Sequence, residues 1–281
     1  MRIAIDGSIA QRHLGGISEY THQMLTALGQ IKTNHQFFVF TTGINDAALE
    51  PLPSLPANFR EIRLRWPQRL LNTTWPRLGW PNIARFLPAH DVFWAPHFLL
   101  PAGHFSKLVV TIHDVLFLDH PEWFTPTDQT TFRQSVTAAT KQADQIITVS
   151  EATKLDLIRH QLSDEKKVSV IPEGVIPDLP SEEHQARVRA NYHLPPTYLL
   201  MIGTLEPRKN ISRVLEAYEQ LIQSGLELPS LILAGRRGWL SEELATALNR
   251  PAVKNRVRWL GSFDRGDKSA LLAGAHALLF P

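Results

Sequence analysis

The chain has 281 residues, of which 43% are hydrophobic and 20% are charged, and its net charge of +2 gives no basic excess of the kind that nucleic-acid binding needs. It contains no cysteine, which excludes a disulfide framework and a thiolate site. No apolar run reaches the roughly eighteen residues of a membrane span, and the chain begins directly on an expected strand without a signal peptide. We therefore expect a cytoplasmic protein with room for two domains of ordinary size.

Short apolar strands alternate with amphipathic helices along the first part of the chain. The expected strands are Ile3–Asp6, Phe37–Phe40, Val92–Ala95, Lys107–Ile112, Ile146–Val149 and Val168–Ile171. Helices are expected from about residue 17, at Thr125–Asp144 and at Glu151–Gln161; one face of the first carries Ile17, Tyr20, Met24, Leu25 and Leu28. Continuous apolar strands between such helices predict a parallel sheet covered on both faces.

Two adjacent glycines, Gly15 and Gly16, precede the first expected helix. Glycine permits a close backbone approach to a ligand and lets N–H groups point at phosphate oxygens. A simple tight turn would explain the same pair. Because a helix opens directly after it, we favour the phosphate contact.

The stretch Arg60–Arg85 is rich in arginine and tryptophan and contains a single acid, Glu61. Its arginines are Arg60, Arg63, Arg65, Arg69, Arg77 and Arg85, and its tryptophans are Trp66, Trp75 and Trp80. Several prolines indicate an irregular segment. Arginine with tryptophan suits an anionic membrane surface or a lipid-linked partner. A packed loop with solvated arginines fits equally well, and nucleic acid is a weaker alternative because no motif supports it.

A histidine and an aspartate, His113 and Asp114, end one of the expected strands, at the sheet edge where active sites gather. They could act on a ligand or form a buried pair that only fixes the loop, and we favour the first. His97, His104 and His120 are expected to be surface or core residues. The twelve histidines show no metal-ligand spacing.

The alternation restarts after a polar stretch from Glu173 to Asn191, which we expect to be a linker and a surface helix. New strands are expected at Tyr198–Ile202, Leu231–Ala234, Val257–Leu260 and Ala277–Phe280, with a helix at Leu271–His276. The restart predicts two Rossmann-like domains, residues 1–175 and 176–281, with a cleft between them that binds ligands.

A strand, a cationic loop and a helix follow one another after residue 197. Gly203 ends the strand, and Asn210 is the expected N-cap of the helix. Between them the loop carries Glu206, Arg208 and Lys209. Two cations beside the free N–H groups of a helix start make a site for a phosphate or diphosphate. The alternative is a solvated loop with a salt bridge, and the position between a buried strand and a helix favours the anion site.

Eight motifs occur in a single order along the chain. They are GGISEY at 15–20, TIHD at 111–114, ITVSEATKLDL at 147–157, VIPEGV at 170–175, GTLEPRKN at 203–210, LILAG at 231–235, VRWLGSF at 257–263 and ALLFP at 277–281. Together they resemble the retaining glycosyltransferases of family four, and GTLEPRKN looks like the mannosyl- and rhamnosyltransferases that build surface polysaccharides. The resemblance implies the GT-B fold, an α/β fold of two doubly wound parallel-sheet domains facing across a cleft.

The resemblance also implies a reaction. A hexose, with mannose from GDP-mannose as first choice, would move from a nucleotide sugar to a glycan or lipid-linked acceptor with retention, without a metal or other cofactor. The enzyme would lie in the cytoplasm, with peripheral attachment to the inner face of the membrane as an option. Arg208 and Lys209 would stabilise the leaving diphosphate, and Gly15 and Gly16 would face them across the cleft.

Further residue roles follow from the same resemblance. The ring or backbone of His113 would contact the transferring sugar, and Asp114 would orient that ring or the acceptor. Phe263 could stack on the donor base or be a packed loop aromatic, and Glu173 is expected at the domain hinge. The expected donor-binding residues are Gly15, Gly16, Gly203, Thr204, Glu206, Asn210, Gly235 and Phe263.

The resemblance has two departures. In the family, a strand like ALLFP is followed by two glutamates eight positions apart that bind the donor sugar, whereas this chain stops at Pro281. We therefore expect a fragment with an incomplete second domain and a partly uncovered strand at Ala277–Phe280, which binds a nucleoside diphosphate weakly and transfers no sugar. Thr204 stands where many relatives carry arginine. The alternatives are a binding-only pseudo-enzyme and a GT-B epimerase or phosphorylase.

Overall fold

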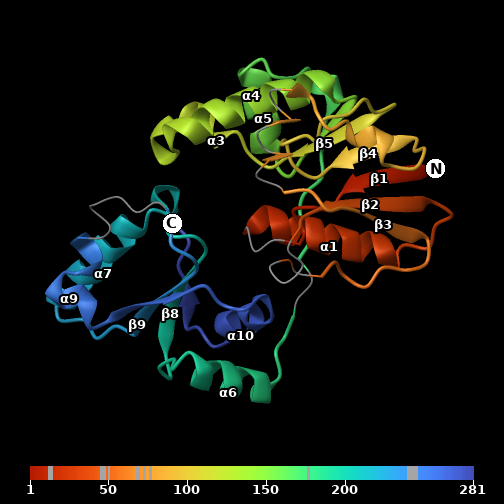
Figure 1. The fold of residues 1–281 in the computed structure, drawn as a ribbon. Coiled ribbons are helices and arrows are strands. Elements are labelled where there is room, and N and C mark those ends of the chain that lie inside the picture. Colours follow the sequence, from red (N-terminus) through yellow and green to blue (C-terminus); the bar gives the residue numbers. More distant parts are fainter. Residues whose placement is uncertain are drawn as a thin grey trace. The chain divides into compact units, whose positions relative to one another are not determined.

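The chain folds into two compact units, Met1–Gly174 and Val175–Pro281 (Figure 1). The computed structural model describes residues 1–11, 15–44, 49, 51–67, 70–71, 74–75, 78–175, 178–238 and 246–281. Within these residues the first unit has a seven-stranded sheet and the second a four-stranded sheet, and all paired strands are parallel. The predicted doubly wound α/β class is confirmed.

The sheet of the first unit has the strand order β3-β2-β1-β4-β5-β6-β7. Its strands are β1 Arg2–Asp6, β2 Gln36–Thr42, β3 Phe59–Leu64, β4 Val92–Ala95, β5 Leu108–Ile112, β6 Gln145–Thr148 and β7 Val168–Val170. The chain builds outward from β1 to β3 and then crosses back to β4 on the other side of β1. This reversal is the switch point beside which ligands bind in open parallel sheets.

Successive residues of a strand point to opposite faces of the sheet, so each central strand feeds two cores. In β1, Ile5 packs in the core beneath α1 (Gly16–Gln30), and Ala4 packs in the core beneath α4 (Pro126–Gln142) and α5 (Glu151–Arg159). Figure 1 shows α1 on one face and α4 and α5 on the other. Short helical turns of this unit include η2 Ile83–Arg85, α3 Leu116–Asp119, η3 Pro121–Trp123 and η4 Glu165–Lys167.

The sheet of the second unit has the order β10-β9-β8-β11. Its strands are β8 Tyr198–Ile202, β9 Ser230–Ala234, β10 Val257–Gly261 and β11 Ala277–Leu278. Its helices are α6 Glu182–Asn191, α7 Ile211–Gln223, α9 Pro251–Lys254 and α10 Lys268–Ala273, with turns η5 Pro207–Lys209 and η6 Arg265–Asp267.

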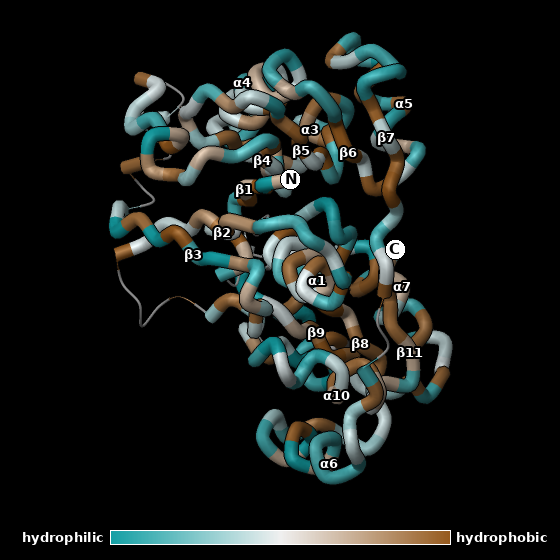
Figure 2. The backbone as a smooth tube through the Cα atoms, turned by 90° about the vertical axis from the view of Figure 1, so that its right-hand side faces the viewer, coloured by the Kyte–Doolittle hydropathy of each residue, from teal (hydrophilic) through white to brown (hydrophobic). Residues whose placement is uncertain are grey.

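The second sheet also separates two cores. In β9, Leu231 and Leu233 pack beneath α7, whereas Ile232 and Ala234 pack beneath α6 and α10. Figure 2 shows β8 and β9 as largely hydrophobic strands and α6 with many hydrophilic positions. At the last strand, Leu278 and Phe280 are 47% and 68% exposed, in line with the predicted partial exposure there.

Two predicted secondary-structure elements differ from those in the structure. Residues 59–64, expected to be irregular, form β3 at the sheet edge, where a strand pairs on one side only and tolerates charges such as Arg60 and Glu61. The helix expected at residues 271–276 lies at Lys268–Ala273. It ends there because His276 N already donates to the carbonyl oxygen of Tyr198, at 2.8 Å, on the way into β11.

Candidate functional site

In the second unit, one glycine directly follows β8 and another directly follows β9. Gly203 follows β8 with a φ of 128°, and Gly235 follows β9 with a φ of 150°. A Cβ atom on Gly235 would lie 1.9 Å from the carbonyl oxygen of Gly203, so no larger residue fits unless the backbone moves. Gly203 N donates to Ala234 O and Gly235 N donates to Gly261 O, both at 2.8 Å. These bonds fix the start of both loops at the carboxyl edge of the sheet.

The loop after β8 contains an ion pair and a tight turn. Arg208 Nε lies 2.6 Å from Glu206 Oε1, so the salt bridge that the sequence offered as an alternative to an anion site is present. The η5 turn brings the chain back, with Lys209 N donating to Glu206 O at 3.0 Å. Within the described part of the chain, Lys209 forms no ion pair of this kind. The loop therefore combines a paired cation, whose side chain is 37% exposed, with an unpaired one.

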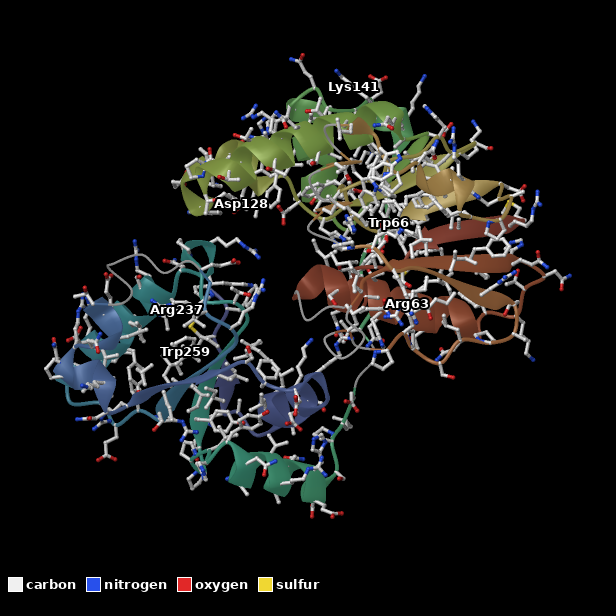
Figure 3. All side chains as sticks on the ribbon, viewed as in Figure 1. Arg63, Trp66, Asp128, Lys141, Arg237 and Trp259 are labelled. Atoms are coloured by element: carbon white, nitrogen blue, oxygen red, sulfur yellow. The ribbon has the colours of Figure 1, made fainter. Side chains whose placement is uncertain are left out.

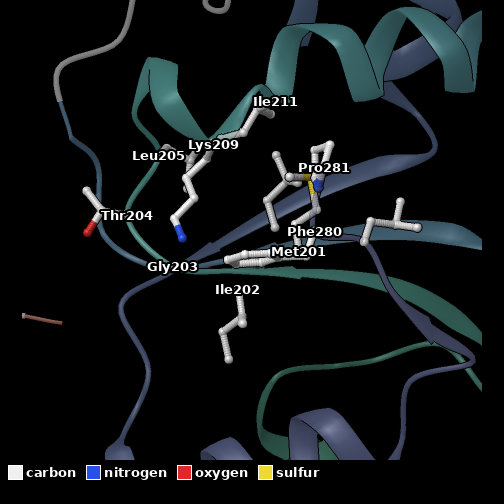
Figure 4. A pocket seen from close by; sticks show the side chains of 11 residues that line it. Met201, Ile202, Gly203, Thr204, Leu205, Lys209, Ile211, Phe280 and Pro281 are labelled. Atoms are coloured by element: carbon white, nitrogen blue, oxygen red, sulfur yellow. The ribbon is translucent and has the colours of Figure 1, made fainter. Parts of the chain in front are cut away.

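The Lys209 side chain extends back toward the turn at Gly203 (Figure 4). Its Nζ lies 4.3 Å from the ring centroid of Phe280, a cation–π distance, and would lie 3.9 Å from a Cβ atom on Gly203. Burial is the largest cause of a lowered Lys209 pKa, and the Arg208 charge adds to it, whereas Glu206 opposes it. An anion placed here would oppose this shift, because its charge would stabilise the protonated amine.

A pocket lies beside this amine and has mostly apolar walls. Its lining residues are Met201, Ile202, Gly203, Thr204, Leu205, Lys209, Ile211, Leu233, Leu279, Phe280 and Pro281. In Figure 4 the Lys209 ammonium group points toward the stretch of backbone at Gly203 and Thr204. The pocket thus offers a cation and a glycine backbone at one end and apolar contacts at the other, a combination that suits an anionic organic ligand.

Asn210 occupies the N-cap position of α7 but does not cap the helix. Its side chain makes no capping hydrogen bond, and its backbone is left-handed, with a φ of 51° and a ψ of 35°. The predicted side-chain cap is therefore wrong. Side-chain capping needs an extended backbone, whereas the η5 turn, closed by Asn210 N donating to Pro207 O at 2.9 Å, leaves Asn210 in a conformation that asparagine tolerates.

Two further cations at this edge were not predicted from the sequence, where only the loop after β8 was considered as a source of cations. Arg236 and Arg237 follow Gly235 in the loop after β9, and both are exposed (Figure 3 labels Arg237). Arg236 Nε donates to Thr204 Oγ1 at 3.3 Å, and Leu205 N donates to Arg236 O at 3.0 Å. The sequence GRRG has the same pattern as GTLEPRK, because in both a glycine directly after an apolar strand is followed by two cations in the loop.

Phe263 lies in the loop after β10, as predicted. It is partly buried and packs against the core beneath α6 and α10. Of the predicted residues in the second unit, Gly203, Thr204, Glu206, Arg208, Lys209, Asn210 and Gly235 gather in the loops after β8 and β9. Phe263 follows the next strand of the same sheet.

In the first unit, His113 follows β5 and is held by three neighbours. Its Nε2 lies 2.9 Å from the carbonyl oxygen of Pro96, and its Nδ1 lies 3.5 Å from Glu173 Oε1. The ring of Tyr20, from α1, meets the imidazole edge to face, with centroids 4.7 Å apart. Since the carbonyl accepts from Nε2, the ring nitrogen that faces Glu173 is the one left to exchange a proton or a hydrogen bond.

Glu173 was expected at the domain hinge, and it lies one residue before the end of the first unit. Its carboxylate is half exposed and reaches back to His113. It is also one cause of a raised Tyr20 pKa, after burial as the main cause, while a hydrogen bond with Thr111 acts the other way. The contact joins residues sixty positions apart, so no local sequence pattern signals it.

Asp114 does not orient the His113 imidazole. Its Oδ1 accepts a hydrogen bond from Leu116 N at 3.3 Å, the local turn that aspartate favours two residues before a donor. The backbone of His113 is fixed instead by Thr153, whose Oγ1 donates to His113 O at 2.9 Å. The carboxylate beside the imidazole belongs to Glu173, so the predicted role of Asp114 toward the ring is corrected.

A second histidine, His97, lies buried beside Asp6 at the same sheet edge. The two residues are 8% and 2% exposed, and His97 Nε2 is 3.8 Å from Asp6 Oδ2. Burial lowers the pKa of His97, Asp6 opposes the shift, and His113 adds to it. His97 Nδ1 accepts from Leu99 N at 3.0 Å, so a neutral ring satisfies the loop. His97 was predicted to be a surface or core residue, and it is buried in the core. Its contact with Asp6 was not predicted.

Gly15 has a φ of 89° and precedes α1, which begins at Gly16. A Cβ atom on either glycine would meet no atom within 4 Å, so nothing in the described structure forces glycine there by contact. The same helix presents Tyr20 to His113. The predicted approach of Gly15 and Gly16 to the cations of the second unit stays a prediction.

The Arg60–Arg85 stretch is partly packed and partly exposed. Trp75 is buried, and Trp66 packs on the first core, with its ring 5.1 Å from that of Trp80 (Figure 3 labels Trp66). Trp80 is 55% exposed. The exposed arginines described in the stretch are Arg60, Arg65 and Arg85, and its other exposed large apolar side chains are Leu70 and Leu78; Phe86, directly after the stretch, is exposed too. Arg69 and Arg77 lie outside the described residues.

Membrane spans and metal clusters are both absent from the part of the chain that the structure describes. No helix among these residues is long and apolar enough to cross a membrane. No group of three histidine, aspartate or glutamate side chains among them could hold a metal ion.

Two successive Rossmann-like units with polar groups after their strands define a two-domain α/β protein of the GT-B class. The sequence model of Glycosyltransferase Family 4 matches residues 14–179, and that of the glycosyl transferases group 1 matches residues 184–281. The chain therefore belongs to glycosyltransferase family 4.

Curated relatives include O-antigen chain mannosyltransferase B of Escherichia coli, 31% identical over 197 residues, which are 68% of this chain and 50% of that protein. A serotype-specific mannosyltransferase, WbdA of Escherichia coli, is 27% identical over 193 residues, or 64% of this chain and 23% of the relative. The match thus spans half or less of these relatives' length. The predicted resemblance to mannosyltransferases of surface polysaccharides is confirmed.

Solved structures with the same fold include sucrose-phosphate synthase from Thermosynechococcus elongatus, with a TM-score of 0.70, 18% identity, and coverage of 100% of this chain and 75% of that one. WaaG, a glycosyltransferase involved in lipopolysaccharide biosynthesis, has a TM-score of 0.67 and 17% identity, and the match covers 100% of this chain and 75% of that chain. HepE from Anabaena, in complex with UDP-glucose, has a TM-score of 0.65 and 18% identity, and the match covers 99% of this chain and 73% of that chain. These likenesses confirm the GT-B fold.

Proposed function

We propose that the protein transfers a hexose from a nucleotide sugar to a glycan or lipid-linked acceptor, with retention of configuration at the sugar. The observation that carries the proposal is the half-buried Lys209 ammonium group over the Gly203 turn, beside a pocket that suits an anionic organic ligand. Residues 176–281 form the donor-side domain and residues 1–175 the acceptor-side domain.

Charge develops on the diphosphate as the bond between the sugar C1 atom and the diphosphate oxygen breaks. Cations held in place before the reaction stabilise this charge without reorganising, and in many enzymes such electrostatic stabilisation accounts for most of the rate enhancement. Lys209 supplies such a cation from a partly buried position. Arg208 supplies a second one once the diphosphate competes with Glu206 for its guanidinium group. The backbone of Gly203, which carries no side chain, leaves room for phosphate oxygens to approach beside the Lys209 amine.

The acceptor-side residues form hydrogen bonds with hydroxyl groups of the sugar and the acceptor. His113, with its Nε2 held by the Pro96 carbonyl, presents Nδ1 beside Glu173 and meets the sugar. Asp114 stays within the proposed site at the end of β5, where its second carboxylate oxygen can accept from an acceptor hydroxyl. Gly15 and Gly16 offer backbone N–H groups to the diphosphate.

GDP-mannose is the proposed donor because the curated relatives are named as mannosyltransferases. UDP sugars are the main competitors, since HepE is seen with UDP-glucose. Titration calorimetry with GDP and UDP ranks the two bases. Incubation of the protein with GDP-mannose or UDP-glucose and a lipid-linked glycan tests transfer, and NMR of the product gives the anomeric configuration. Nucleotide binding without transfer to any acceptor would favour a binding-only protein.

The exposed part of the Arg60–Arg85 stretch is proposed as a contact with an anionic membrane at the cytoplasmic face, where lipid-linked acceptors would be reached. Trp80 and Leu78, with Phe86 directly after the stretch, offer apolar surface, and Arg65 and Arg85 offer positive charge. Sedimentation with vesicles should show binding that rises with anionic lipid and weakens with salt. The Arg65→Gln, Arg85→Gln double variant should bind less. Equal binding to neutral and anionic vesicles would contradict the proposal.

A further inference from the structure

The loop after β9 is held against the loop after β8 beyond the end of the strands. The parallel backbone ladder continues past the two glycines, because Leu205 N donates to Arg236 O at 3.0 Å and Gly238 N donates to Leu205 O at 3.1 Å. A Cβ atom on Gly238 would lie 2.5 Å from Leu205 O, which shows how tightly the two backbones pack. Arg236 therefore starts from a fixed backbone position.

The side chain of Arg236 is also oriented. Its Nε donates to Thr204 Oγ1 at 3.3 Å, which ties down the near end of the guanidinium group. Among the described residues no carboxylate pairs with Arg236, so its two terminal NH₂ groups keep their hydrogen-bonding capacity. A guanidinium group held through Nε by a neutral hydroxyl still carries its full charge and presents a planar fork of donors.

Arg236 and Lys209 flank consecutive residues of one turn. Lys209 Nζ lies over Gly203, and Arg236 reaches Thr204. Each cation comes from a different loop. An oxyanion bound at this turn would therefore meet one point charge and one fork, an arrangement that matches a group with several oxygens, such as a diphosphate.

We propose that Arg236 is a diphosphate-binding residue of the donor site and that Thr204 is its positioning residue. This inference rests on the proposed function, because it assigns a further residue to the same nucleotide-sugar site. Arg236 differs from Arg208, whose Nε is already engaged by Glu206 at 2.6 Å and must exchange partners to bind an anion. It differs from Arg237, for which the described residues offer no side-chain contact that fixes its direction.

The test is calorimetric binding of GDP, UDP, guanosine and uridine to the 281-residue chain and its variants. Arg236→Gln should weaken the binding of the diphosphates at least about tenfold, because it removes charge-assisted hydrogen bonds, and should leave nucleoside binding unchanged. Arg236→Lys, which keeps the charge but loses the fork, should give an intermediate loss. Thr204→Val keeps the side-chain shape and removes the acceptor, and should cost about threefold for diphosphates.

Arg256→Gln is the matched control, since it removes one exposed arginine just before β10, at the opposite edge of the same sheet. It should leave every affinity within about twofold. Thermal unfolding checks each variant, and Arg236→Lys and Thr204→Val carry the test if Arg236→Gln does not fold.

Failure of the inference can be told from failure of the proposed function. If the wild-type chain binds neither GDP nor UDP, both are overturned. If it binds them, and Lys209→Ala weakens binding while the variants at Arg236 and Thr204 do not, only the inference is overturned. Equal losses for diphosphates and nucleosides would also overturn it, because they would mean that Arg236 supports the fold of the loop and not the phosphate contact.

Discussion

The carboxyl edges of the two sheets carry opposite chemistry. At the edge in the first unit lie acids and histidines, namely Asp6, His97, His113 and Glu173. At the edge in the second unit lie the cations Arg208, Lys209, Arg236 and Arg237, and Glu206 is paired to the first of them. Both sheets are parallel and bury apolar strands on two faces. The strands therefore set the position of each edge, and the loops set its charge.

The two edges also differ in how far their charges are already satisfied. Asp6 and His97 are buried and partner each other, and His113 is held between Pro96 and Glu173. The side chains of this edge therefore satisfy one another and have little uncompensated charge to offer an anion. The cations of the second edge are exposed or half-buried, so they gain most from an anion.

The largest effect is expected from a substitution that disrupts the carboxyl edge of the second sheet. Gly235→Ala should destabilise the second unit by about 3 kcal/mol, because its Cβ atom meets the Gly203 carbonyl oxygen and the backbone φ is positive. Gly225→Ala is the control: its φ is 85°, but no atom lies within 4 Å of the new Cβ atom, so only about 1 kcal/mol is expected. Amide hydrogen exchange at Leu200 reads out the second unit. Equal exchange in both variants would contradict the collision.

The next largest effect is expected for Lys209→Ala, which tests whether the cationic edge of the second unit alone binds the nucleotide. Lys209→Ala should weaken GDP or UDP binding at least about tenfold and, in a form of the protein that transfers sugar, lower turnover by a similar factor. Lys254→Ala, at an exposed position at the end of α9, should change neither. If His113→Ala weakened nucleotide binding as much as Lys209→Ala, the division of roles between the two edges would be lost.

A smaller effect is expected at the first edge. Glu173→Gln removes the charged partner of His113 and should slow turnover about fivefold, the equivalent of one net hydrogen bond of about 1 kcal/mol. The affinity for GDP or UDP should stay unchanged, and Glu173→Asp should restore part of kcat. The control is Glu122→Gln, which removes an exposed carboxylate 3.2 Å from another histidine, His120. A rise in the nucleotide Kd on Glu173→Gln would place this residue with the donor phosphates instead.

The smallest effect is a pH dependence of stability from the buried His97. Its pKa in the folded chain is lowered from 6.5, mainly by burial, so the unfolded chain binds the proton more readily. The free energy of unfolding should therefore fall as the pH drops below about 6.5, and the effect should be absent above it. Urea unfolding at pH 7.5 and 5.5 should show a smaller loss in His97→Asn, whose side-chain oxygen can accept from Leu99 N. His104→Asn, an exposed change, should behave like the wild type.

The sequence was most informative where a strand is buried on both faces. Val92–Ala95 and Tyr198–Ile202 were predicted with the bounds that the structure has, because their apolar runs are continuous. The edge strand β3 was missed because it pairs on one side and carries as many charged residues as apolar ones, in the sequence FREIRL. Edge strands need little apolar surface, so their pattern is weak.

The candidate site was predictable where its residues are close in sequence. The loop with Arg208 and Lys209 lies between a strand and a helix, and its place at the sheet edge followed from that order. The contact of Arg236 with Thr204 and that of Glu173 with His113 join distant segments, so they needed the structure. The failed cap at Asn210 depended on a backbone angle that residue type alone does not fix.

The lowered pKa of Lys209 makes this amine a chemical handle. Acylating reagents attack the neutral amine, and at mildly alkaline pH a lysine with a lowered pKa has more of it than a solvated lysine has. A reagent present in limiting amount should therefore mark Lys209 ahead of exposed lysines such as Lys254. Occupancy of the pocket could then be followed by mass spectrometry as protection of one side chain, without a radioactive donor or a known acceptor.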